Sequence, residues 1–439
     1  MSRAVVRPKS WVMFILLAIC LINSAALAQD PARFPKPEFE SGYQQPPTQT
    51  PPPRSTGREW MDVFVLAVAL GLTSYFALKK RSRRAIWAMA VFSVIYFGFI
   101  REGCVCAVGS LQNVSAALFL SDYVIPLTVL AFFVIPLIFT LFFGRTFCAA
   151  VCPLGAVQDL VMVKPVPVAG WLQEVLGLFR YVYLGFAVLF AATGSAFLIC
   201  RYDPFVSIFR MGNDFGMMLY SIGFVALSIF VARPYCRFLC PYGVLLGWMS
   251  QLSKKHLTIT PDSCHVCRLC ETSCPMGAID KPTPEKLPVT REQGIRRIGV
   301  LLILVPVMMA VGGGTFSRLD VFLSKMHPTV SLAEKIDLEN RTGTAGTTVE
   351  TLTFRSSGTP AETLFAEAGI IRKRFRIGGW LLGGFLGLIL GVKLIGLSIF
   401  RTSTEYEPNR AACFSCGRCF SYCPNEHLRL ENIQKHGYV

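Results

Sequence analysis

The chain has 439 residues, of which 53% are hydrophobic and only 16% are charged. A soluble protein carries about 25% charged residues, so the composition excludes an ordinary soluble protein and favours a polytopic membrane protein. The net charge of +16 does not indicate a nucleic-acid partner, because the basic residues lie beside apolar spans, most clearly in the run from Lys79 to Arg84. Such a run is typical of the cytoplasmic flank of a membrane helix.

The N-terminus predicts a secretory signal peptide over residues 1–28. Basic residues precede an apolar stretch from Trp11 to Ile22, and Ala26-Leu27-Ala28 offers a cleavage site. An uncleaved anchor is the alternative. Residues 29–59 follow as a proline-rich linker, which we expect on the periplasmic side and without a fold of its own.

Seven apolar spans are expected after the signal, so the predicted fold class is a polytopic α-helical membrane protein. Most of them reach the ~17–25 residues that a bilayer crossing needs. With the linker outside, three loops (79–84, 144–177 and 233–297) and the C-terminus lie on the cytoplasmic side of a bacterial inner membrane. The spans are expected at 60–78, 85–100, 124–143, 178–199, 215–232, 298–316 and 377–400.

The domain organisation follows from these spans. The outer loop is rich in Gly, Thr and Ser over 341–358, which predicts a flexible segment or a small β-rich cap. A basic run, Arg372 to Arg376, breaks the charge rule on that outer side. The segments are a five-span core at 60–250, a first cytoplasmic unit at 251–297, the sixth span at 298–316, the outer loop at 317–376, the seventh span at 377–400 and a second cytoplasmic unit at 401–439.

Lys393 lies within the last predicted span. A charge inside the membrane is a candidate functional residue. Because Lys393 is close to the end of the span, its side chain is also long enough to reach the cytoplasmic surface, and we favour this second interpretation.

Two cysteine motifs of identical spacing carry the chemistry. Both read Cys-x-x-Cys-x-x-Cys-x-x-x-Cys-Pro, the spacing with which bacterial ferredoxins hold a [4Fe–4S] cluster. Zinc sites usually divide their ligands into two well-separated pairs, so a zinc knuckle is the less favoured alternative. We expect two [4Fe–4S] clusters, and their ligands are Cys264, Cys267, Cys270, Cys274, Cys413, Cys416, Cys419 and Cys423.

In two-cluster ferredoxins, the fourth cysteine of each motif binds the cluster of the other motif. We therefore expect the motifs to form one split ferredoxin-like unit at the cytoplasmic face, with Cys423 completing the first cluster and Cys274 completing the second. Two separate knuckles, each with its own four cysteines, are the alternative.

A second pair of motifs lies at membrane edges, in the pattern Arg-x-aromatic-Cys-x-x-x-Cys-Pro-x-Gly. The pattern occurs twice, each time after a span that enters the cytoplasm, which indicates a duplicated unit. Cysteines at i and i+4 share one face of a helical turn. Four thiolates at the interface between the repeats are thus candidate ligands of an additional metal centre, with reactive dithiols or a structural turn as alternatives. They are Cys148, Cys152, Cys236 and Cys240.

A third, degenerate copy contains Cys104 and Cys106 on the predicted outer face. The stretch from Cys106 through Gly109 to Gln112 parallels the stretch from Cys152 through Gly155 to Gln158. Cys200 ends the fourth span on the same face. If these residues hold a redox centre, the protein has electron stations on both sides of the membrane.

Two Cys-x-x-x-Cys-Pro motifs after membrane spans, followed by two ferredoxin motifs, resemble the NosR/NapH family of polyferredoxin membrane proteins. The resemblance covers about residues 60–439, is closest to the membrane half of NosR-type members, and is strengthened by the stretch from Met326 to Glu334. It implies a quinol-linked electron path that feeds a periplasmic reductase or its maturation. NosR-type proteins carry a flavin-binding domain before the spans, where this chain has a signal and a linker, so flavin is expected only from a partner.

The sequence shows no general acid–base pair, phosphate loop or nucleotide fingerprint, and we assign no catalytic residue. Two functions remain open. One is electron transfer between a quinol or cytoplasmic donor and an extracytoplasmic reductase or partner. The other is an accessory factor that reduces a metal or thiol while a respiratory metalloenzyme matures.

Overall fold

The computed structural model describes residues 55–103, 106–121, 123–210, 215–259, 264–283, 291–344, 346–398 and 403–436. The predicted signal peptide, the linker up to residue 54 and Cys104 lie outside the described residues. Five helical stretches in the described residues are long and apolar enough to cross a membrane. They are α2 (Thr56–Leu78), α3 (Arg83–Ser93) continued by the π-helix η2 (Val94–Ile100), α7 (Gly170–Ala192), α14 (Arg291–Ser317) and α18 (Ala361–Ser398).

Two further apolar helices are shorter, α5 (Leu127–Phe143) and α10 (Phe215–Phe230). All seven coincide in position with the expected spans, although α7 begins and ends several residues earlier than predicted. The described residues therefore support a helical membrane protein with five candidate spans. The count of seven crossings and the cytoplasmic orientation stay predictions.

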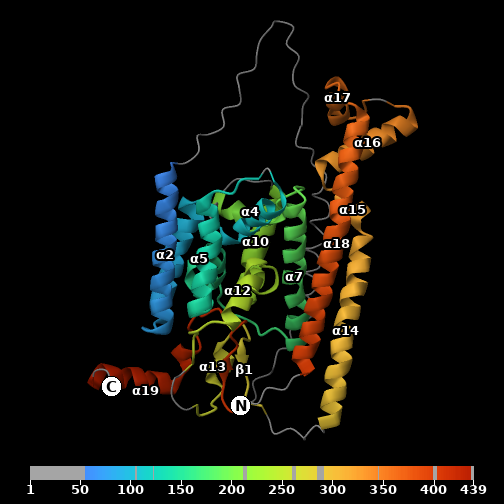
Figure 1. Ribbon diagram of the computed structural model, residues 1–439. Helices are drawn as coiled ribbons and strands as arrows, with labels where there is room; N and C mark the ends of the chain where they lie inside the picture. Colours follow the sequence, from blue (N-terminus) through green and yellow to red (C-terminus); the bar gives the residue numbers. More distant parts are fainter. Residues whose placement is uncertain are drawn as a thin grey trace.

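Short helices complete the bundle, in which Figure 1 shows α2 beside α5 on one side and α7 on the other. A shared apolar core, which includes Leu70, Phe132, Leu184 and Tyr242, joins them. The short helices are α4 (Ala107–Phe119), η3 (Phe147–Val151), α6 (Pro153–Leu160), α8 (Leu198–Tyr202), α9 (Val206–Arg210), α11 (Pro234–Phe238) and α12 (Tyr242–Gln251).

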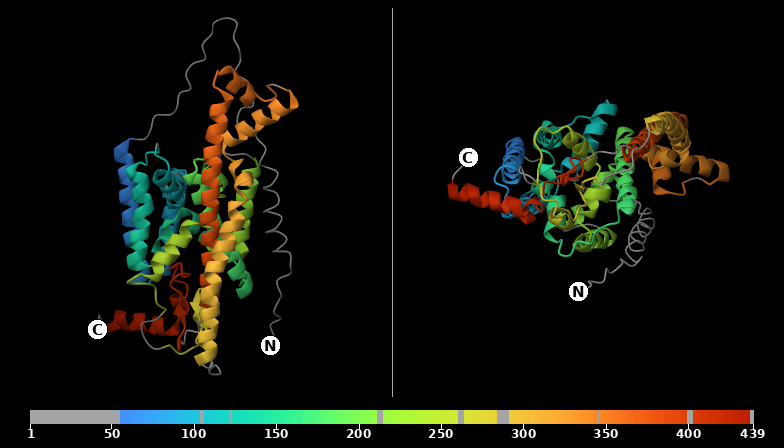
Figure 2. Two further views of the ribbon diagram at one scale, coloured as in Figure 1. Left: turned by 45° about the vertical axis from the view of Figure 1, so that its right-hand side comes forward. Right: turned by 90° about the horizontal axis from the view of Figure 1, so that it is seen from below.

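Helices α14 and α18 form a closely packed pair beside α7 (Figures 1 and 2). Glycine recurs at every fourth position of α18, at residues 379, 383, 387 and 391. A Cβ atom added to Gly383 would overlap the carbonyl oxygen of Gly312 in α14. Small residues let membrane helices approach each other backbone to backbone, so this glycine stripe explains why the pair packs so closely.

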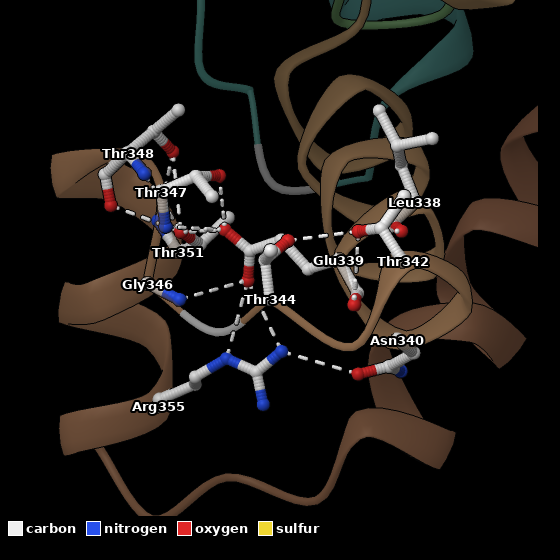
Figure 3. Close-up of polar contacts among 10 residues, drawn as sticks. All are labelled: Leu338, Glu339, Asn340, Thr342, Thr344, Gly346, Thr347, Thr348, Thr351 and Arg355. Atoms are coloured by element: carbon white, nitrogen blue, oxygen red, sulfur yellow. Dashed lines mark hydrogen bonds and ion pairs between the residues drawn. The ribbon is translucent and has the colours of Figure 1, made fainter.

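The segment between these two helices, which the sequence predicts on the outer side, is helical in its described residues, so the expectation of a β-rich cap is wrong there. It contains α15 (Asp320–Ser324), α16 (Pro328–Thr342) and α17 (Val349–Ser356). Figure 3 shows how the buried Glu339 joins α16 to α17. Its carboxylate accepts hydrogen bonds from the hydroxyls of Thr347 and Thr351, both at 2.6 Å, and from Arg355 at 3.1 Å. These hydrogen bonds lower the pKa of Glu339 below its usual value.

The outer basic run now has a structural explanation. Arg372 pairs with Glu334 of α16 at 2.9 Å, and Arg376 pairs with Asp320 of α15 at 2.9 Å. α18 is one helix that begins at Ala361, well before the predicted start of the last span. Its basic residues form ion pairs with α15 and α16.

The two ferredoxin motifs lie together at one end of the bundle, below the helices in Figure 1. Strands β1 (Ile279–Asp280) and β2 (Glu407–Pro408) pair antiparallel, with Ile279 opposite Pro408. This ladder joins two segments that α14, the outer helices and α18 separate in the sequence. The unit also contains α13 (Leu269–Ser273), η4 (Phe420–Tyr422) and α19 (Pro424–His436).

Candidate iron–sulfur sites

The loops of the two ferredoxin motifs have the same backbone conformation. Val266 and Ser415, each two residues after a first cysteine, have φ of 53° and 52°. The backbone N–H of each donates to the sulfur of that cysteine at 3.4 Å, Cys264 in one loop and Cys413 in the other. A β-branched residue at positive φ is strained. The same unusual turn at equivalent positions therefore fits a loop that must wrap three sulfurs around a cluster.

Cys274, the fourth cysteine of the first motif, lies among the cysteines of the second. Burial raises the pKa of the Cys274 thiol, and the neighbouring Cys416 raises it further. Burial likewise raises the pKa of Cys413 to about 12, with Cys416 and Cys274 adding to the rise. Burial also raises the pKa of Cys419, and Cys413, Cys416 and Cys274 add to this rise. These interactions place Cys274 with the second motif, where the predicted exchange of fourth ligands requires it.

The other three cysteines of the first motif interact with one another. Burial raises the pKa of Cys270 to about 11, and Cys264 and Cys267 contribute to the rise. Cys423 packs against the buried cluster that contains Cys270 and Cys419, as do Cys264, Cys274 and Cys413. The assignment of each cysteine to a cluster stays a prediction.

Buried thiols of this kind remain protonated unless a metal replaces the proton, because burial disfavours the thiolate. Thiolate is the ligand that iron–sulfur clusters select. Among the described residues, no group of three or more His, Cys, Asp or Glu side chains is already placed to hold a metal ion.

The four cysteines of the duplicated pattern, Cys148, Cys152, Cys236 and Cys240, are here called the repeat cysteines. All are buried, at 7% or 8% exposed. Gln158 donates to the sulfur of Cys236 at 3.3 Å, and the N–H of Gly243 donates to the sulfur of Cys240 at 3.3 Å. Cys148 interacts electrostatically with both cysteines of the other repeat. The structure thus brings together the two pairs that the sequence placed at one interface.

Two buried arginines, which sequence reasoning left without a role, cross between the repeats. A Cβ atom on Gly243 of the second repeat would lie 3.2 Å from Arg145 of the first, and one on Gly155 of the first would lie 3.6 Å from Arg233 of the second. Arg233 also donates to the carbonyls of Cys148 and Ala149. Both glycines thus leave room for a guanidinium from the opposite repeat. The sequence contained a signal for these arginines, because both copies of the repeated pattern begin with Arg.

Phe414 connects this region to the second ferredoxin loop. Its ring lies 4.3 Å from the guanidinium carbon of Arg145 and 5.6 Å from that of Arg233. Arg145 also donates to the carbonyl of Ala411 at 2.9 Å. Because Phe414 directly follows Cys413, the second ferredoxin loop is inserted beside the repeat cysteines.

The third, degenerate motif has a comparable geometry in its described residues. A Cβ atom on Gly109 would lie 3.3 Å from the sulfur of Cys200. Gln112 accepts hydrogen bonds from the N–H groups of Ile199 and Cys200, much as Gln158 accepts one from the N–H of Tyr235. Cys106, the N-cap of α4, interacts electrostatically with Cys200. A redox role for these two residues and for Cys104 stays a prediction.

Lys393 has an acidic partner. Its Nζ donates to the carboxylate of Glu174 at 2.7 Å, near the start of α7. That end of α7 lies toward the ferredoxin unit (Figure 1), which suits the interpretation that Lys393 reaches the membrane surface.

The comparisons with known proteins agree with these sites. A family model described as a 4Fe-4S binding domain matches residues 125–175 and 213–260, which include all four repeat cysteines. A second model of the same description matches residues 257–280, which include the first ferredoxin motif. No solved structure matches the chain.

Three curated relatives extend this result. NirI of Paracoccus denitrificans is 33% identical over 32% of this chain and 22% of its own length. The putative electron transport protein YccM of Escherichia coli is 27% identical over 32% of this chain and 43% of its own. Regulatory protein NosR of Pseudomonas aeruginosa is 26% identical over 43% of this chain and 28% of its own. The chain spans less than half the length of each.

Over part of its length, the chain is thus similar to NirI, YccM and NosR. The resemblance predicted from the cysteine motifs is therefore confirmed. Together with the two 4Fe-4S models, the relatives support an iron–sulfur electron-transfer protein, and they do not favour the assembly factor that the sequence left open. The number of clusters, the direction of electron flow and the partners are not established by these similarities.

Proposed function

We propose that the protein carries electrons between a quinol or cytoplasmic donor and an extracytoplasmic reductase or other partner. Two [4Fe–4S] clusters at the cytoplasmic end of the helical bundle would accept and donate single electrons. Any flavin in this path would belong to a partner. The similarity to NirI, YccM and NosR supports the electron-transfer role, and the duplicated loop geometry supports the clusters.

The placement of Cys274 carries the proposal. Cys274 lies with Cys413 and Cys416, although Cys274 and Cys413 are 139 positions apart in the sequence. Cluster one would be held by Cys264, Cys267, Cys270 and Cys423, and cluster two by Cys413, Cys416, Cys419 and Cys274. The protein would bury the sulfurs, orient them with N–H groups and exclude water.

The exchange of fourth ligands predicts which variants resemble each other. Full-length protein is purified anaerobically in detergent as three single variants, Cys267→Ser, Cys416→Ser and Cys274→Ser. Cys267→Ser marks the loss of cluster one and Cys416→Ser the loss of cluster two. We expect the paramagnetic resonance spectrum of reduced Cys274→Ser to match that of Cys416→Ser, because both remove a ligand from the same cluster.

Two results would count against this proposal in different ways. If the Cys274→Ser spectrum matches that of Cys267→Ser, each motif closes its own cluster and the exchange is wrong. If the unmodified protein is colourless or contains zinc in place of iron, the electron-transfer function itself is wrong.

A further inference from the structure

Cys106 and Cys200 come from different elements, and both of their sulfurs lie against Gly109. Cys106 is the N-cap of α4, and its sulfur accepts hydrogen bonds from the N–H groups of Val108 and Gly109. Cys200 is in α8, and a Cβ atom on Gly109 would lie 3.3 Å from its sulfur. Gln112 holds α8 in place by accepting from the N–H of Cys200 at 3.3 Å. A disulfide needs its two sulfurs in contact, and glycine leaves no side chain between these two.

The two thiols differ in exposure, as the two sulfurs of a thiol–disulfide relay must. Cys200 is exposed, so another protein can reach its sulfur. Cys106 is only partly exposed, and burial, together with the neighbouring Asp203, raises the pKa of its thiol to about 12. Because the thiolate is the attacking form, Cys200 is suited to react with an external disulfide, and Cys106 is suited to close the ring afterwards.

Asp203 supplies a proton acceptor beside Cys106. It is 4% exposed, and burial raises the pKa of its carboxyl to about 6. The carboxylate accepts from the N–H of Phe205 at 2.8 Å, which orients it. A carboxyl whose pKa lies near neutrality can take up a proton and release it again. Asp203 can therefore remove the proton of Cys106 when this thiol attacks.

These residues lie between the repeat cysteines and the far half of the bundle. Cys106 is within electrostatic range of Cys152 of the first repeat. α4, which begins after Cys106, lies in the half of the bundle away from the ferredoxin unit (Figure 1). Both Cys106 and Cys200 fall outside the residues that the 4Fe-4S models match. Their position thus suits a step that follows the iron–sulfur sites.

We propose that Cys106 and Cys200 form a redox-active disulfide that passes electrons from the clusters to a disulfide of an extracytoplasmic protein. This rests on the proposed function, which supplies the electrons. Two electrons, delivered one at a time, and two protons cleave the Cys106–Cys200 bond to give two thiols. The Cys200 thiolate then attacks the disulfide of the acceptor protein and forms a mixed disulfide. Cys106 gives its proton to Asp203 and attacks Cys200, so the internal disulfide re-forms and the acceptor leaves as a dithiol with the two protons.

The first test identifies the disulfide. Full-length protein is purified anaerobically in detergent, and one portion is oxidised with glutathione disulfide while another is reduced with dithionite. Each portion is alkylated and digested, and its peptides are identified by mass spectrometry. We expect peptides linked through Cys106 and Cys200 in the oxidised portion and not in the reduced one. Alkylation of both residues in the oxidised portion, or linkage of either residue to Cys104, would overturn the proposal.

The second test follows the electrons. The protein is reduced, separated from the reductant and mixed with glutathione disulfide, while paramagnetic resonance records the reoxidation of the clusters. We expect Cys200→Ser to keep both ferredoxin-type signals but to lose this reoxidation. Arg201→Met is the matched control, because Arg201 is exposed and stacks on Tyr202 at 5.8 Å, and its clusters should be reoxidised as in the unmodified protein. Asp203→Asn should form the same linkage but react more slowly.

The outcomes separate this proposal from the proposed function. Equal reoxidation in Cys200→Ser and Arg201→Met would overturn the relay and leave the electron-transfer function intact. A loss of iron from Cys200→Ser with both ferredoxin-type signals retained would also overturn it, because Cys200 would then be a metal ligand. Equal rates in Asp203→Asn and the unmodified protein would remove Asp203 from the mechanism. Absence of both signals from the unmodified protein would instead refute the proposed function.

Discussion

Arg81 is the residue whose replacement should most directly detach the ferredoxin unit from the membrane helices. It lies in the loop between α2 and α3, within the basic run that the sequence presented as a membrane flank. Its guanidinium pairs with Glu426 of α19 at 2.5 Å, donates to the carbonyls of Thr258 and Ile259, and stacks on Phe420 at 4.9 Å. One side chain thus holds α19 and the segment that leads into the first motif.

The expected magnitude follows from burial. The side chains of Arg81 and Glu426 are 6% and 0% exposed, and removing one partner of a buried ion pair costs about 3–5 kcal/mol. Arg429 would still pair with Glu426 at 3.0 Å, so we expect the lower end for Arg81→Met, about 3 kcal/mol. Since about 1.4 kcal/mol is tenfold in an equilibrium, the docked state should be disfavoured by roughly a hundredfold.

Hydrogen exchange of the cluster-loaded protein in detergent measures this local opening. Peptides from α19 should lose protection in Arg81→Met, whereas peptides from α5 should not change. Lys80→Met is the matched control, because Lys80 is exposed and only approaches the Phe76 ring, at 5.7 Å. The reasoning is refuted if α19 exchanges equally in the two variants, or if the change in Arg81→Met is below about 0.5 kcal/mol, the usual effect of a surface substitution.

Two further predictions concern the α14–α18 pair and the helices between them in the sequence. Gly383→Ala should destabilise the α14–α18 pair by about 1–3 kcal/mol, as overpacking does in other cores. Gly396→Ala is the control, because Gly396 has open space around it, and it should change the midpoint of thermal unfolding little. Equal midpoints in the two variants would contradict the close packing at Gly383. The lowered pKa of Glu339 means that its contribution to stability is present above its unfolded pKa of about 4.3 and is lost as the pH falls below that value. Limited proteolysis of the α16–α17 segment should therefore speed up on acidification in the unmodified protein but not in Glu339→Gln, and equal acid sensitivity would contradict this.

The ferredoxin loops could be predicted from the sequence because their geometry is local. Three cysteines at i, i+3 and i+6 determine a short loop whatever surrounds it, and the structure gives both loops the same positive-φ turns at Val266 and Ser415. The apolar helices were predictable for a similar reason, since lipid demands long runs of apolar residues. The expectation that both motifs lie at one end of the bundle also agrees with the structure, through the pairing of β1 with β2.

The rest depends on contacts between distant segments. The roles of Arg145 and Phe414 arise only when the second ferredoxin loop packs against the first repeat, across more than 260 positions of sequence. The outer segment was misjudged because Gly and Thr around residue 343 suggested a flexible or β-rich loop. They form the short connection between α16 and α17, where Gly343 has φ of 70° and the threonines bond to Glu339.

The insertion of α14 and α18 between the two ferredoxin motifs has a physical consequence. If the fourth ligands are exchanged, neither cluster can form until both spans are in place and the chain has returned to the same end of the bundle. The second loop then brings the Phe414 ring against Arg145 and Arg233, so the ferredoxin unit is completed in contact with both repeats. Formation of the clusters would therefore depend on insertion of the last two spans.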